Sequence, residues 1–182
     1  MRIIAGQWRG RKLVAPKGDA TRPTADRTRE TLFSMLTSRL GSFDELSVLD
    51  LFAGSGALGL EALSRGAAHA HFVEHDKPAL DAIRANITAL DARTRTTVSA
   101  ASVMSLGPAK VPHDLILADP PYGTSAGEVA LDRLLRLGWI GEQTWIAVET
   151  GATEDIDVKG LAIETTRKVG KAKLTILRLA PA

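Results

Sequence analysis

The sequence predicts an α/β domain in which a mainly parallel β-sheet carries helices on both faces and ends in an antiparallel hairpin. Three observations predict this fold. Short apolar runs alternate with helical stretches from Leu46 to the end, and a Gly-x-Gly-x-x-Gly run, Gly54 to Gly59, lies between the first such strand and its helix. The length of 182 residues allows one full domain with a short appendage.

The beginning of the chain is expected to form a basic β-hairpin followed by a loop. Apolar pairs flank a glycine-bearing turn at residues 7–10, which predicts two short strands within residues 2–14. Pro16, Gly18 and Pro23 then indicate the loop.

One helix and the alternating series follow. Apolar residues at helical spacing, closed by Gly41, predict a helix over Thr28–Leu40. The expected strands are Ser47–Leu51, His69–Glu74, Thr96–Ser99, His113–Ala118, Thr144–Glu149, Ala162–Lys168 and Lys173–Leu179. The expected helices of the series are Ala57–Arg65, Lys77–Leu90 and Gly127–Leu137.

Charge is distributed unevenly along the chain. Residues 1–40 hold nine Lys and Arg against three Asp and Glu, whereas residues 41–182 hold fourteen against eighteen. We expect residues 1–24 to be a basic extension of a main domain at residues 25–182. Such an arm is suited to a polyanion, although a solvated basic face explains the same charges.

Composition excludes several classes of protein. Hydrophobic residues make up 45% and charged residues 24%, which excludes disorder as the main state. The absence of cysteine excludes disulfides, thiolate zinc sites and a cysteine nucleophile, including the covalent route to methylating a pyrimidine carbon. No apolar run approaches the roughly 20 residues of a membrane span, and the first residues lack a signal-peptide core. A cytoplasmic protein is expected.

The glycine run predicts a nucleotide-binding turn. Glycines let the backbone approach a ligand closely, and Glu74 ends the next strand, where its carboxylate can accept hydrogen bonds from ribose hydroxyls. This pattern alone fits both a dinucleotide and S-adenosylmethionine. Asp50, just before the loop, favours the second, because its negative charge suits a cationic sulfonium better than a pyrophosphate.

A second motif follows the fourth strand of the series. Asp119, Pro120, Pro121 and Tyr122 place an acid, two residues without N–H groups and an aromatic ring at a carboxyl-end loop. The Asp119 carboxylate and nearby carbonyl oxygens can accept the two N–H bonds of an exocyclic amine, and Tyr122 can stack on its base. An isolated Pro-Pro-Tyr would suggest only a turn, but the glycine loop favours methylation of an amine.

The sequence resembles the RsmD family of small-subunit rRNA guanine methyltransferases over nearly its full length. The resemblance rests on the segments 2–13, 22–24, 26–33, 50–59 and 119–122. It implies the class I S-adenosylmethionine-dependent methyltransferase (Rossmann-like) fold, with a seven-stranded, mainly parallel sheet and an antiparallel last strand, beside the N-terminal hairpin. It also implies methyl transfer to the 2-amino group of one guanine, with S-adenosylhomocysteine as product.

Matching positions assign site residues. Asp119 would hold the target amine within the catalytic set Asp119, Pro120, Pro121 and Tyr122. The cofactor would contact Asp50, Phe52, Gly54 and Gly56 with its methionine part, Glu74 with its ribose and His75 with its adenine.

Three further residues complete the expected cofactor site. Ser102 stands where many members of the wider superfamily place an acidic or amide side chain near the adenine, and it offers only a hydroxyl or its backbone. Thr24 and Arg27 are candidates for the cofactor's carboxylate, although either could contact RNA instead. No catalytic histidine and no metal are required by this chemistry.

The basic arm is the expected RNA contact. The candidates are Trp8, Arg9, Arg11, Lys12 and Arg22, which combine positive charge with one stacking ring. Trp8 could instead pack against the core. The expected partner is small-subunit rRNA, within an assembling 30S particle, and the expected oligomeric state is a monomer.

Three alternatives remain at this stage. The motif also fits an adenine-N6 amino-methyltransferase acting on DNA or RNA, although no insertion for flipping a base from a duplex is visible. A non-catalytic nucleic-acid-binding module would not need Asp119 to Tyr122, and an NAD-dependent dehydrogenase would explain the glycine loop alone. Binding of S-adenosylmethionine separates the enzyme from the binding module.

Overall fold

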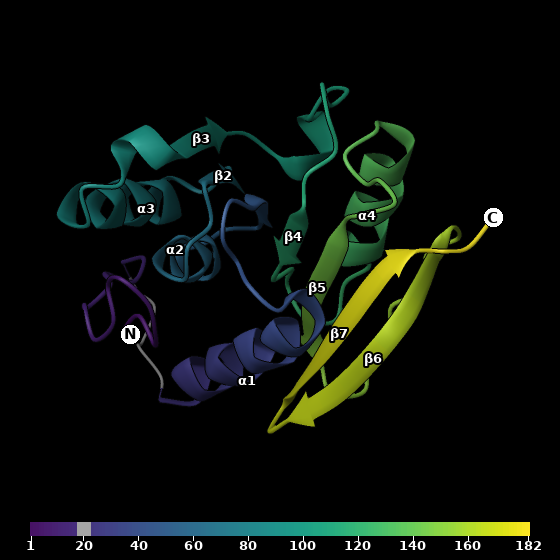
Figure 1. Ribbon diagram of the computed structural model, residues 1–182, viewed down its shortest axis with the longest axis horizontal. Coiled ribbons are helices and arrows are strands. Elements are labelled where there is room, and N and C mark those ends of the chain that lie inside the picture. Colours follow the sequence, from purple (N-terminus) through teal and green to yellow (C-terminus); the bar gives the residue numbers. More distant parts are fainter. Residues whose placement is uncertain (18–22) are drawn as a thin grey trace.

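A seven-stranded sheet in the order β3-β2-β1-β4-β5-β7-β6 organises the computed structural model (Figure 1). The structure describes residues 1–17 and 23–182, with Pro23 and Thr24 described only as part of a helix. The strands are β1 (Ser47–Leu51), β2 (His69–Glu74), β3 (Thr96–Ala100), β4 (Leu115–Ala118), β5 (Trp145–Gly151), β6 (Leu161–Val169) and β7 (Ala172–Leu179). The helices are α1 (Pro23–Leu40), α2 (Ala57–Ser64), α3 (Lys77–Ala89) and α4 (Ala126–Arg136), with short 3₁₀ helices η1 (Arg93–Arg95) and η2 (Val103–Ser105).

The strand directions confirm the predicted mixed sheet. Strands β1 to β5 pair in parallel, whereas β7 pairs antiparallel with both β5 and β6. The predicted strand and helix bounds of the alternating series agree with the structure to within two residues.

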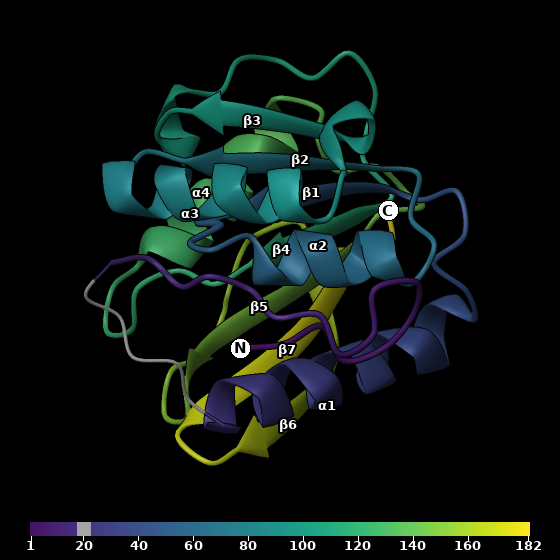
Figure 2. The same cartoon turned by 90° about the vertical axis from the view of Figure 1, so that its left-hand side faces the viewer.

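Helices cover both faces of the sheet, so each face has its own core. Helices α1, α2 and α3 lie on one face and α4 lies on the other (Figures 1 and 2). Alternation along β4 shows the division, because Leu117 joins the core beneath α1 to α3 while Ile116 and Ala118 join the core beneath α4. Among the described residues, no helix has the length and apolar character to cross a bilayer.

Helix α1 begins earlier than predicted. It starts at Pro23, five residues before the expected Thr28, and includes a proline that had indicated a loop. Proline is favourable at the first helical position, because its missing N–H would have no helical partner there. The apolar spacing reveals only the part of the helix that packs against the core, such as Leu32 and Leu36.

The N-terminal hairpin is present, but it carries one isolated bridge, Arg2 with Lys12, rather than the two predicted strands. Ile3 donates its N–H to the Arg11 carbonyl across the hairpin, but other backbone donors bond to the main domain. The N–H groups of Ile4 and Ala5 donate to the Glu61 carboxylate of α2 at 2.9 and 3.1 Å, so they cannot form a ladder across the hairpin. The hairpin lies between α1 and the pair α2 and α3 (Figure 2).

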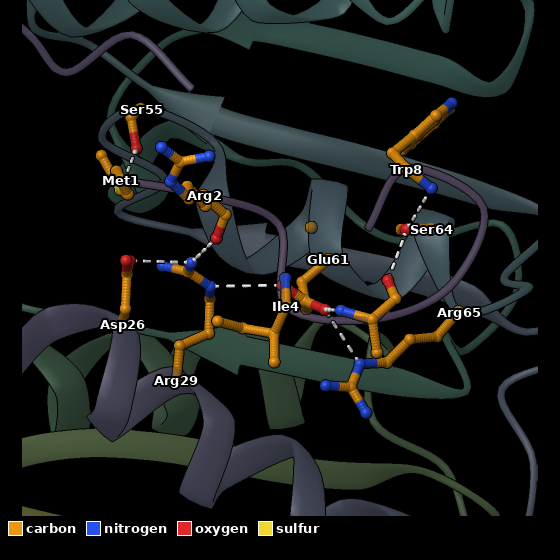
Figure 3. A network of polar contacts seen from close by, with 12 residues as sticks. Met1, Arg2, Ile4, Trp8, Asp26, Arg29, Ser55, Glu61, Ser64 and Arg65 are labelled. Carbon is orange, nitrogen blue, oxygen red and sulfur yellow. Dashed lines mark hydrogen bonds and ion pairs between the residues drawn. The ribbon is translucent and has the colours of Figure 1, made fainter. Parts of the chain in front are cut away.

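Glu61 joins the hairpin to two helices (Figure 3). Its side chain is fully buried and also accepts hydrogen bonds from Arg29 of α1 and from Arg65, the residue that follows α2. The Arg29 guanidinium in turn donates to the Arg2 carbonyl and to Asp26. The core on this side contains Ile3 and other hairpin residues together with residues of the main domain. The boundary between residues 24 and 25 stays a prediction.

Candidate active site at the carboxyl ends of the strands

The site lies where the sheet reverses its order. The chain leaves β1 towards α2 on one face and leaves the neighbouring β4 towards α4 on the other face (Figure 1). In open α/β sheets such a point creates a crevice at the carboxyl ends of the strands, where ligands bind. Four acidic side chains occur there, one from each of four adjacent strands or the turn after it: Glu74, Asp50, Asp119 and Glu149.

The loop between β1 and α2 has the backbone that its glycines predict. Gly54 and Gly56 have φ of 57° and 82°, and Phe52 has φ of 54°, which is uncommon for a residue with a side chain. Gly59 serves packing, since a Cβ there would lie 2.5 Å from the Phe72 ring. The loop therefore turns tightly and brings α2 close to β2.

Asp50 lies beneath this loop rather than at its surface. It is 1% exposed, and its Oδ2 accepts the N–H of Gly59 at 2.9 Å, while Oδ1 has no hydrogen-bond partner within the described parts of the chain. Burial raises the pKa of Asp50 well above its usual value, and the charges of Asp119 and Glu74 act in the same direction. Asp50 can thus influence a ligand in two ways: through the charge of its carboxylate, and by holding the N–H of Gly59 at the end of the glycine run.

Replacing Asp50 by asparagine is expected to stabilise the protein and weaken S-adenosylmethionine binding. A raised pKa in the folded state means that the stability of the wild type is lost as pH rises from the unfolded pKa through the folded one. The neutral amide avoids this loss, so urea unfolding should show a gain in stability at pH 8 that shrinks as the pH is lowered. Calorimetry should show roughly tenfold weaker cofactor binding, because a negative charge near a sulfonium is gone. Unchanged stability at pH 8 would contradict this role of burial.

Glu74 fixes the loop from the end of β2. Its Oε1 accepts the N–H of Gly54 at 2.9 Å, and its Oε2 accepts the N–H groups of His75 and Asp76. A carboxylate has about four acceptor positions, so one remains for the expected ribose hydroxyl. The proposed ribose contact thus coincides with a structural role.

The other expected cofactor residues are His75, Ser102, Arg27 and Thr24. The His75 side chain is exposed beside Glu74. Ser102 Oγ accepts the N–H of Met104 at 3.2 Å and caps η2, which leaves its proton for a ligand. Arg27 is exposed on α1. Thr24 belongs to α1, but its side chain lies outside the described residues.

The loop after β4 is fastened to β5 and to the loop that follows it. The Tyr122 hydroxyl donates to Glu149 Oε2 at 2.5 Å, and the N–H of Gly123 donates to Glu154 Oε1 at 2.8 Å. Sequence reasoning missed both glutamates. In the sequence Glu149 follows an apolar run as Asp119 does, and that parallel was the available signal. The Tyr122 residue is 48% exposed, so the fixed ring can still stack on a base.

Asp119 is exposed to solvent, yet the pKa of its carboxyl group is raised. The surrounding protein limits hydration of its carboxylate, and this effect together with the charge of Glu149 raises the pKa of Asp119 to about 7. Burial also raises the pKa of Glu149, although the hydrogen bond from Tyr122 opposes the shift. The two carboxylates therefore influence each other's ionisation near neutral pH.

Methyl transfer is expected to rise with pH around neutrality. An ionised Asp119 accepts N–H bonds, whereas the protonated form donates one, so kcat should fall about tenfold per pH unit below pH 6 and level off above about pH 8. The profile is measured between about pH 5.5 and 9. Removing the neighbouring charge with Glu149→Gln should lower the Asp119 pKa and move the rise to lower pH. An unchanged midpoint in that variant would contradict the coupling.

The structure separates the expected RNA residues into two groups. Arg9, Arg11 and Lys12 are exposed, although Arg11 also donates to the Ala89 carbonyl of α3. Arg22 lies outside the described residues.

Trp8 does not fit the expected role of a free stacking ring. It is 6% exposed and belongs to the core beneath α1 to α3. Its backbone N–H donates to Ser64 Oγ. The Arg95 guanidinium lies 5.3 Å from its ring centroid. The Trp8 side chain therefore packs in the core on the face that α1 to α3 cover, as the alternative expects.

Within the described residues, no group of three or more His, Asp or Glu side chains is arranged to hold a metal ion.

A family model and two curated relatives match most of this chain. The family model described as "Conserved hypothetical protein 95" matches residues 1–178. "Ribosomal RNA small subunit methyltransferase D" of Escherichia coli is 41% identical over 82% of this chain and 74% of that protein, and the protein of the same name from Haemophilus influenzae is 38% identical over 82% and 78%.

Solved structures share the fold. An Escherichia coli protein superposes with a TM-score of 0.86 at 34% identity, covering 100% of this chain and 99% of the other. Magnesium protoporphyrin IX methyltransferase from Synechocystis, solved with S-adenosylmethionine, has a TM-score of 0.67 at 14% identity, covering 90% of this chain and 87% of the other. The second likeness concerns the fold alone.

Proposed function

The chain belongs to the RsmD family, whose model carries the description conserved hypothetical protein 95, and from this premise we propose that it is an S-adenosylmethionine-dependent rRNA methyltransferase. We infer further that it methylates the 2-amino group of one guanine in small-subunit rRNA. The observation that carries the proposal is the Asp119 to Tyr122 loop, which lies at the carboxyl end of β4 beside the glycine loop after β1. The names of the relatives support the rRNA substrate.

The residues present fit S-adenosylmethionine. A tight loop at the end of β1, a carboxylate at the end of β2 and the unpartnered Oδ1 of buried Asp50 suit a ligand that carries an adenosine and a positive charge. When bound, this cofactor supplies a methyl group activated by the positive sulfur that carries it.

The protein's own residues then hold and orient the amine. Asp119 accepts one N–H, a carbonyl of the Pro-Pro turn accepts the other, and the nitrogen lone pair is left to point towards the methyl group. As the new C–N bond forms, the bond between the methyl carbon and sulfur would break, with its electron pair left on sulfur. The amine loses one proton, which can pass to ionised Asp119 or to water. Such positioning can lower a barrier by roughly 7–11 kcal/mol, so no metal or covalent enzyme intermediate is needed.

Transfer of labelled methyl from S-adenosylmethionine to small-subunit rRNA tests this function. The RNA is offered naked and as partly assembled 30S particles, and product nucleosides are then separated. The proposal expects labelled 2-methylguanosine, and the better substrate form identifies the natural partner. Label on adenine would instead support the adenine-N6 alternative, and no label despite measured cofactor binding would contradict an rRNA substrate.

The exposed cations of the hairpin are proposed to contact rRNA. Deleting the hairpin would not test this, because Ile3 and Leu13 are part of the core. Replacing Arg9 and Lys12 by glutamate should weaken binding and reduce the salt slope of log K by roughly two, since about one counterion is released per phosphate contact. Replacing Lys110 and Lys159 by glutamate, at two exposed residues outside the hairpin, is the control with the same change of charge. An unchanged salt slope in the Arg9 and Lys12 double variant would exclude these two hairpin residues as the RNA contact.

A further inference from the structure

Glu149 lies beside the proposed amine site but has no role in the proposed reaction. It follows Val148, which pairs with Ala118, just as Asp119 follows Ala118 on the neighbouring strand. Residues at equivalent positions of adjacent parallel strands point to the same face of the sheet. The effect of the Glu149 charge on Asp119 agrees with this closeness.

The two carboxylates have open acceptor positions. Tyr122 donates to Oε2 of Glu149, whereas Oε1 receives no hydrogen bond from any residue the structure describes. The Asp119 carboxylate likewise receives none from the described chain. Tyr122 comes three residues after Asp119 and its hydroxyl reaches Glu149, so one short loop connects the two acids.

No cation among the residues that the structure describes forms an ion pair with these carboxylates. Two neighbouring carboxylates with limited hydration repel each other, and each disfavours the ionised form of the other. A ligand that brings more than one hydrogen-bond donor would remove this penalty.

Guanine offers the matching donors and adenine does not. On the Watson–Crick edge of guanine, the ring N1–H lies next to the 2-amino group, so two adjacent positions donate. Adenine has its amino group next to an N1 lone pair, which would face a carboxylate with no proton between them. Two acceptors side by side therefore favour guanine and repel adenine.

We propose that Glu149 is a specificity-determining residue, which accepts a hydrogen bond from the guanine N1–H while Asp119 accepts one from the 2-amino group. The inference rests on the proposed function and specifies how that site selects its base. Tyr122 holds the Glu149 carboxylate in place through Oε2 and leaves Oε1 to the base.

The test uses 2-aminopurine, which keeps the 2-amino group of guanine but has a lone pair at N1. After the methylated guanine has been mapped, small-subunit rRNA is ligated from segments with guanine or 2-aminopurine at that position. Both RNAs are offered in the form that the wild type prefers, naked or as particles. The measured quantity is the ratio of kcat/KM for guanine to kcat/KM for 2-aminopurine.

The wild type is expected to prefer guanine by about 10- to 100-fold, the discrimination usual for one lost base contact. In Glu149→Gln the amide can donate to the N1 of 2-aminopurine, so the ratio should fall to about one or below. Glu154→Gln is the matched control, because Glu154 holds Gly123 and Gly151 N–H groups and has no place at the base. This control should lower both rates equally and leave the ratio unchanged.

Tyr122→Phe removes the hydrogen bond to Glu149 but keeps the Glu149 carboxylate. This variant should therefore retain most of the guanine preference. Cofactor affinity and melting temperature verify that each variant is folded. A wild-type ratio in Glu149→Gln would overturn the inference while leaving guanine methylation intact. Failure of the wild type to form 2-methylguanosine at all would instead refute the proposed function.

Discussion

Replacing Asp119 by alanine is expected to lower kcat for methyl transfer by roughly 10²- to 10³-fold, the effect typical of removing one preorganised polar group from an active site. The variant loses the carboxylate that accepts an amine N–H, so the lone pair is no longer aimed at the methyl group. The Asp119 carboxylate has no hydrogen-bond partner in the described chain, and the backbone N–H keeps its bond to the Leu51 carbonyl, so the substitution should leave the fold unchanged. The measurement combines single-turnover methylation of small-subunit rRNA with calorimetry of S-adenosylmethionine.

The cofactor affinity separates this role from a structural one. It should change by less than about threefold, because Asp50 and Glu74 keep the glycine loop in place. Asp155→Ala is the matched control. It removes an exposed carboxylate in the loop after β5, which pairs with Lys173 of β7. Turnover close to that of the wild type in Asp119→Ala would refute the assignment.

Replacing Glu61 by alanine is expected to destabilise the protein by about 3–5 kcal/mol, the usual result of removing one partner of a buried ion pair. The change removes one of the two carboxylates that pair with the buried Arg29 guanidinium and leaves the N–H groups of Ile4 and Ala5 without their acceptor. The free energy of unfolding is measured with urea. The melting temperature should fall by roughly 6–20 °C for a chain of this size.

Two further variants make this prediction robust. Glu61→Gln keeps the shape and part of the acceptor capacity, so it should be destabilised less and remain measurable if the alanine variant does not fold. Asp81→Ala removes an exposed pair with Lys77 and should have no measurable effect. Equal stability of Glu61→Ala and Asp81→Ala would show that the network in Figure 3 does not stabilise the fold.

The sheet and the two loops of the site were predictable because each depends on local sequence. Buried parallel strands are short apolar runs, and the glycine loop and the Asp119 motif each lie within a few residues of one strand end. Their meeting at one crevice follows from the general geometry of such sheets. The chain thus specifies much of its site through short segments.

The features that sequence reasoning missed depend on contacts between distant segments. Glu149 becomes part of the site only through the pairing of β5 with β4 and the hydrogen bond from Tyr122. Trp8 in a basic segment fits an RNA contact and a core anchor equally well, and the choice depends on α2, more than fifty residues away. The start of α1 was missed because its first turn is not marked by apolar residues.

The tethering of the hairpin has a consequence for the order of events during protein synthesis. Its partners lie far downstream: Ile4 bonds to Glu61, Val14 to Asn86 and Gln7 to Arg95, which is 88 residues away. At a translation rate of about 5–20 residues per second, Gln7 is synthesised roughly 4–18 s before its partner Arg95. The first part of the chain to be made is therefore among the last to fold. Interruption of synthesis before Arg95 should leave its apolar residues open to aggregation or proteolysis.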